Sequence, residues 1–173
     1  MVIEIQIDPS QWLIEDSSWD RVGPSYEANP VVERGAAYTH AWGASYGSFA
    51  YAFLLSAGVW IGATISARLS SEHPWYSSPS NYFSDVALSV NESVYPSKRV
   101  IPDNGWGAVY AWSIKPDHLQ EGPNKLTFLV KRNAPYRNGL CIYHRAVIPG
   151  EHDQSVTVTV ESDADGRGSP STS

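Results

Sequence analysis

The segment VWIGATISARLS, residues 59–70, decides how this chain folds. In its second half, apolar and polar side chains alternate strictly. The apolar set is Ile65, Ala67 and Leu69, and the polar set is Thr64, Ser66 and Arg68. A period of two places the sets on opposite faces of an extended chain. The segment is therefore predicted to be a β-strand with one face turned toward a core.

Strand patterns of the same kind recur along the chain, separated by segments rich in Gly, Pro, Asn and Ser. We predict strands at residues 2–7, 35–42, 48–55, 59–70, 84–90, 94–101, 108–114, 125–132, 140–148 and 155–160. Residues 8–30 show no clear period, although they have room for a short strand, and residues 116–119 suit one short helical turn. Many short strands with this punctuation predict an all-β antiparallel sandwich or barrel.

The length of 173 residues fits one domain with a core of its own. We expect a domain at residues 1–161 and a disordered tail at residues 162–173, which are polar and glycine-rich. The single cysteine, Cys141, excludes an internal disulfide, and we interpret it as a small buried apolar residue. No multi-cysteine metal site is expected.

A formal charge of −6 argues against nucleic acid or an anionic membrane as partner, because both need a basic surface. Neither a signal peptide nor an 18-residue apolar run is present, so we expect a soluble chain. Aromatic residues make up 12% of the chain, with seven Trp and ten Tyr against four Phe. This excess of amphipathic rings favours a binding surface.

Strand counting assigns the loops to two ends of the fold, because consecutive antiparallel strands reverse direction. One end, called here the loop end, would carry residues 43–47, 71–83, 103–107 and 133–138. The other, called the turn end, would carry residues 56–58, 91–93, 115–124 and 149–154. The aromatic residues of the loops fall at the loop end, and the turn end has none.

The loop end combines the groups that a sugar needs, since sugar C–H faces stack on Trp and Tyr while hydroxyls bond to Asn, Asp and Arg. Trp106 is its centre, held between two glycines on a polar turn where a core position is unfavourable. The predicted ligand-binding residues are Trp106, Trp75, Tyr76, Asn104, Asp103, Arg137, Asn138, Trp42, Tyr46 and Tyr82. The alternative is that these rings seal the sandwich end without a ligand.

Two other functions use the same end. Glu72 and Asp103 are a carboxylate pair that counting places there, as a small glycoside hydrolase requires. Asp103 is also a good turn former, and Glu72 fits a solvated strand end. A third reading is a module for protein interaction or assembly, whose aromatic end meets another protein.

No cofactor is expected, because the five histidines are scattered without metal-binding spacing. A structural Ca²⁺ would leave little trace in the sequence of a β-sandwich. The triplet Asn91-Glu92-Ser93 has the spelling of a glycosylation acceptor, which is common by chance.

Two segments carry a resemblance to a known fold family. SDVALSVNESVYPSKRV (84–100) has a Val-Asn turn between two strands, and WSIKPDHLQEGPNKLTFLV (112–130) has Gly122-x-Asn124 before an alternating strand. Together they resemble the galactose-binding-domain-like jelly roll of carbohydrate-binding modules and ancillary domains of glycoside hydrolases. The resemblance covers residues 48–160, and Glu92 stands where that family has glycine.

What the resemblance implies is a β-sandwich of two packed antiparallel sheets, often non-catalytic and often sugar-binding at the loop end. The expected function is thus a carbohydrate-binding or ancillary module, within a larger enzyme or an oligomer. No individual residue role is carried over from the family.

Overall fold

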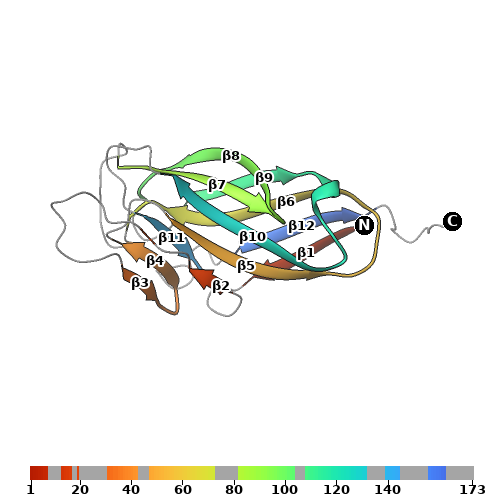
Figure 1. The fold of residues 1–173 in the computed structure, drawn as a ribbon, viewed down its shortest axis with the longest axis horizontal. Helices are drawn as coiled ribbons and strands as arrows, with labels where there is room; N and C mark the ends of the chain where they lie inside the picture. Colours follow the sequence, from red (N-terminus) through yellow and green to blue (C-terminus); the bar gives the residue numbers. More distant parts are fainter. Residues whose placement is uncertain are drawn as a thin grey trace.

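The computed structural model describes residues 1–7, 13–16, 19, 31–42, 47–72, 82–103, 108–131, 139–144 and 156–162. Within them the chain forms strands and one short 3₁₀ helix (Figure 1). The elements are β1 Val2–Ile7, β2 Leu13–Asp16, β3 Val31–Arg34, β4 Tyr38–Trp42, β5 Gly47–Leu55, β6 Trp60–Ser70, β7 Ser84–Val90, β8 Ser93–Val100, β9 Ala108–Ile114, η1 Pro116–His118, β10 Gly122–Lys131, β11 Leu140–Tyr143 and β12 Val156–Ser162. Among the described residues, no helix has the length and apolarity to cross a membrane.

Two antiparallel sheets pack face to face, as the alternating patterns predict. One contains β2, β5, β10, β7 and β8 in that order, and the other contains β1, β12, β6, β11, β4 and β3, with β9 also paired to β6. The predicted all-β sandwich is confirmed. The predicted bounds of the strands at 2–7, 84–90 and 108–114 agree with β1, β7 and β9.

The strand that opened the sequence argument, β6, is the centre of the larger sheet. Ile65, Ala67 and Leu69 are fully buried, whereas Thr64 is exposed and Arg68 half-buried. The inward face meets apolar residues of β10 and β12, among them Phe128 and Val158. Alternation in the sequence therefore built the core directly.

The far side of β6 carries two strands in succession. Cys141 of β11 pairs with Ser70, and Thr157 of β12 pairs with Ser66, both antiparallel to β6. Hence β11 and β12 run in the same direction, and the strand predicted at 140–148 ends at Tyr143. Because β6, at 11 residues, is long enough for two partners, the reversal of direction stops at β11. The assignment of residues 149–154 to the turn end was therefore wrong in its premise.

The strand predicted at 35–42 is also wrong, because two strands form there. Gly35 N–H bonds to the Tyr38 carbonyl at 2.8 Å and closes a tight turn between β3 and β4. The irregular stretch 8–30 contains β2, which pairs with β5. The helical turn expected at 116–119 is η1.

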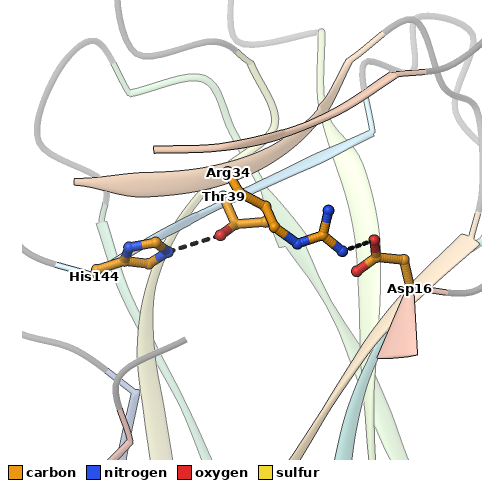
Figure 2. A network of polar contacts seen from close by, with 4 residues as sticks. All are labelled: Asp16, Arg34, Thr39 and His144. Carbon is orange, nitrogen blue, oxygen red and sulfur yellow. Dashed lines mark hydrogen bonds and ion pairs between the residues drawn. The ribbon is translucent and has the colours of Figure 1, made fainter. Parts of the chain in front are cut away.

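An ion pair ties the edges of the two sheets together (Figure 2). Arg34 on β3 bonds to Asp16 on β2, and nearby Thr39 Oγ1 lies 2.8 Å from His144 Nε2. Since the Arg34 side chain is 51% exposed, the pair contributes at most about 1 kcal/mol. Its role is to close one long side of the sandwich.

Candidate functional site

The strand registers bring the borders of four loops to one end of the molecule. Gly47 of β5 lies opposite Val130 of β10, and Ser84 of β7 lies opposite Val100 of β8. Leu69 of β6 pairs with Ala108 of β9. Strand ends that flank residues 43–46, 73–81, 104–107 and 132–138 therefore lie together, as strand counting predicted for these four loops.

Ser70 joins two of these borders through one oxygen atom. Its Oγ accepts the backbone N–H of Glu72 at 3.2 Å and that of Asp103 at 3.0 Å. Ser70 itself is fully buried at the end of β6. A single hydroxyl thus fixes the first residues after β6 against the segment that follows β8. We call this arrangement the Ser70 clasp.

The next residue, Ser71, closes the long loop between β6 and β7. Its N–H bonds to the Ile101 carbonyl at 3.3 Å, and its Oγ donates to the Tyr82 carbonyl at 2.6 Å. Residues 71 and 82 border the loop on either side. The loop therefore leaves and re-enters the sandwich at one point.

Two buried tyrosines hold the segment around Asp103. The Tyr143 hydroxyl donates to the Asp103 carbonyl at 3.0 Å, and the Tyr110 hydroxyl accepts the Ile101 N–H at 3.1 Å. Burial raises the pKa of both phenols, and the Asp103 carboxylate raises them further. Both tyrosines therefore stay neutral and serve as fixed hydrogen-bonding groups.

Three of the predicted site residues have described positions at this end. Glu72 and Asp103 are brought together by the Ser70 clasp, and Tyr82 is half-buried with its carbonyl on Ser71. Trp42 ends β4, and its side chain lies outside the described part. The remaining predicted residues, Tyr46, Trp75, Tyr76, Asn104, Trp106, Arg137 and Asn138, lie outside the described residues. Their roles stay predictions.

Sequence reasoning missed a row of buried polar residues that crosses four strands beside the clasp. Register places Glu33, His40, Cys141 and Ser70 next to one another on β3, β4, β11 and β6. His40 is fully buried, with Nδ1 3.9 Å from a Glu33 oxygen. These residues are far apart in the sequence, so only strand register reveals the row.

The chemistry of that row is structural. Burial raises the pKa of the Cys141 thiol most, the Tyr143 hydroxyl works against it, and Glu33 and Glu72 add to the rise. A neutral, fully buried thiol is a poor nucleophile, so the interpretation of Cys141 as a buried residue is confirmed. Among the described residues, no three His, Cys, Asp or Glu side chains gather into a metal site.

The turn end is closed by side-chain amides. Asn91 Nδ2 donates to the His118 carbonyl at 2.7 Å and to Asn124 Oδ1 at 2.8 Å. Asn124 Nδ2 donates to the carbonyls of Gln120 and Gly122. With both amide hydrogens of Asn91 engaged, the residue works as a structural link, which explains its spelling without glycosylation.

Comparison with known proteins rests on structure, because no protein-family model and no curated protein matches this chain. The C-terminal CBM6 of LamC, a marine laminarinase from Zobellia galactanivorans, is similar with a TM-score of 0.50 and 9% identity, over 93% of this chain and 100% of that one. A family 35 carbohydrate-binding module from Clostridium thermocellum has a TM-score of 0.48 and 12% identity, over 91% and 97%. A family 35 module from an environmental isolate has 0.47 and 14%, over 94% and 93%.

The chain has the β-sandwich fold of a carbohydrate-binding module. The resemblance seen in the sequence is therefore confirmed for the fold. Its two motifs meet in space, since Asn91 of the Val-Asn turn and Asn124 of Gly-x-Asn bond to each other.

Proposed function

We propose that this chain is a non-catalytic carbohydrate-binding module whose glycan ligand binds at the loop end. The observation that carries the proposal is the Ser70 clasp, which joins the borders of the two loops that contain Trp75 and Trp106. A rigid base under loops that bear rings is what a stacking site requires.

In the proposed complex, a sugar ring stacks on Trp106 and on Trp75 or Tyr76. Asn104, Asp103, Arg137 and Asn138 bond to its hydroxyls, and Trp42, Tyr46 and Tyr82 line the surroundings. Aromatic faces supply affinity, and paired polar groups supply orientation. The similar module of the laminarinase is C-terminal in its enzyme, which supports an ancillary role within a larger glycan-active protein here.

Affinity electrophoresis against a panel of polysaccharides tests this function. We expect retardation by at least one glycan, with Trp106→Ala weakening binding roughly tenfold or more. Trp60→Ala is the matched control, because Trp60 lies half-buried at the start of β6, at the turn end. It should lower stability and leave binding intact. No retardation by any glycan, or equal binding by Trp106→Ala, would reject the proposal.

The same clasp favours a second candidate, a glycoside hydrolase that uses Glu72 and Asp103. Their backbones meet at Ser70 Oγ, so both carboxylates start from one place. Hydrolysis needs such groups about 5 Å apart for retention and about 6.5–9.5 Å for inversion. Glycan cleavage that Glu72→Gln and Asp103→Asn each abolish would support it, and full activity in either variant would eliminate it.

A further inference from the structure

The first strand leaves one side of the larger sheet open. β1 pairs with β12 from Val2 to Ile7, and no other strand in the described part pairs with it. β1 also lacks Pro and Lys, the residues that commonly protect a sheet edge from further pairing. It therefore presents an edge suited to another strand.

The direction of its free backbone groups follows from the start of the ladder. Met1 and Ser162 exchange two hydrogen bonds, at 3.1 and 2.8 Å. In an antiparallel pair, hydrogen-bonded positions alternate with non-bonded ones. The odd residues of β1 therefore bond to β12, and the N–H and C=O groups of Val2, Glu4 and Gln6 point to the open side.

An apolar groove of about 340 Å³ runs beside this edge, lined by Ile5, Gln6, Ile7, Ala52, Phe53 and Leu54. The groove lies between β1 and the part of β5 beyond Tyr51, where pairing with β2 has ended (Figure 1). Leu54 and Val2 are 66% and 64% exposed. A strand with apolar side chains at every second position would fill the groove while its backbone bonds to β1.

We propose that the occupant is β1 of a second copy, which forms a two-fold symmetric dimer with one continuous sheet. β1 is such a strand, since Ile3, Ile5 and Ile7 alternate with Val2, Glu4 and Gln6. An antiparallel pair of identical edges is self-complementary, as a two-fold interface requires.

The pairing register follows from charge. With Ile5 opposite the partner's Ile5, Glu4 lies opposite the partner's Gln6, and all facing backbone groups are those that point outward. Gln6 Nε2 already donates to Glu4 Oε1 within one strand at 3.1 Å, so the two groups are complementary. The neighbouring register sets Glu4 against the partner's Glu4, which like-charge repulsion disfavours.

The dimer is weak, because one short strand pair buries less than the roughly 1,200 Å² of a stable interface. Sedimentation equilibrium of the full chain over a wide concentration range should show a reversible monomer–dimer equilibrium. Gln6→Glu, which faces the partner's Glu4, should raise the dissociation constant roughly 2- to 30-fold from two symmetric like-charge contacts. Gln6→Lys should lower it.

Glu161→Lys is the matched control, since it changes an exposed charge on β12 away from the open edge. Its dissociation constant should equal that of the parent, and circular dichroism should show all variants folded. A monomer at every concentration, or a dimer that responds alike to both Gln6 variants, would overturn the proposal. This outcome is independent of glycan binding.

Discussion

At the turn end, Asn91 and Asn124 form one network with the backbone of η1 and β10, and Asn124 is 2% exposed. At the loop end, Ser70 and Tyr143 hold the borders of loops through single bonds to Glu72 and Asp103. The first end is a closed network of amides with its own turn. The second is a set of anchors for long loops. The difference indicates that the turn end stabilises the fold, whereas the loop end is the place for function.

The largest effect is expected where the turn end is broken. Asn124→Ala removes bonds to two carbonyls and leaves Asn91 Nδ2 short of an acceptor in a buried place. The free energy of unfolding should fall by about 2–4 kcal/mol, as measured by urea denaturation. Glycan affinity per folded molecule should not change. A loss of affinity with unchanged stability would contradict the assignment of this end to the fold.

Breaking the clasp should have the opposite balance. Ser70→Ala leaves two backbone N–H groups without their acceptor, so stability should fall by about 1–3 kcal/mol. Glycan affinity, measured by calorimetry on folded protein, should fall several-fold because the loops lose their common base. Ser66→Ala on the same face of β6 is the control, with both quantities expected to stay near parent values. Unchanged affinity in Ser70→Ala would separate the clasp from the binding site.

Alkali should distinguish the two ends by a smaller effect. Burial raises the pKa of Tyr110 and Tyr143 above the ordinary 10.0, whereas the unfolded chain titrates near that value. Folding therefore favours the protonated phenols. Their contribution to stability is complete below pH 10 and is lost as pH rises through the higher folded pKa.

Denaturation in a series of buffers across pH 10 measures this contribution. Stability of the parent should fall with rising pH, and the fall should be shallower in the double variant Tyr110→Phe, Tyr143→Phe. Tyr38 and Tyr51 have raised pKa values too, so part of the slope remains in that variant. An identical slope in both proteins would exclude the two loop-end phenols as its source.

How far the sequence predicted this molecule depends on the range of each interaction. Alternation over residues 64–69 predicted the faces of β6, because a strand's burial is encoded by neighbours two positions apart. The two partners of β6 on one side could not be predicted this way, since a pairing choice between β11 and β12 leaves no local pattern. The hairpin at Gly35 was missed because one glycine is a weak turn signal within an apolar run.

The candidate site was predicted in part for the same reason. Strand counting placed Glu72 and Asp103 at one end, and the Ser70 clasp brings them together. The clasp itself was missed, because one serine at a strand end resembles any other. The row from Glu33 through His40 to Cys141 requires the registers of three strand pairs. No spacing within the chain encodes those registers.

The smallest effect concerns the residue at which the chain departs from the family it resembles. Asn91 and Glu92 have φ values of 48° and 74°, so the turn between β7 and β8 needs left-handed backbone at both positions. Asn tolerates this conformation and Glu does not, which is why glycine is the favoured second residue. Glu92→Gly should raise the unfolding free energy by about 0.5–1 kcal/mol, with relief of strain exceeding the entropy that glycine gains in the unfolded chain.

Glu121→Gly is the matched control, because Glu121 is an exposed glutamate at the same end without a positive φ. It should lower stability slightly, since only the entropic term remains. Opposite signs for the two substitutions, read from urea midpoints at equal slope, would assign the effect to backbone strain. Destabilisation by both would mean that the Glu92 side chain compensates for its backbone. The turn end would then owe part of its stability to that side chain as well as to its asparagines.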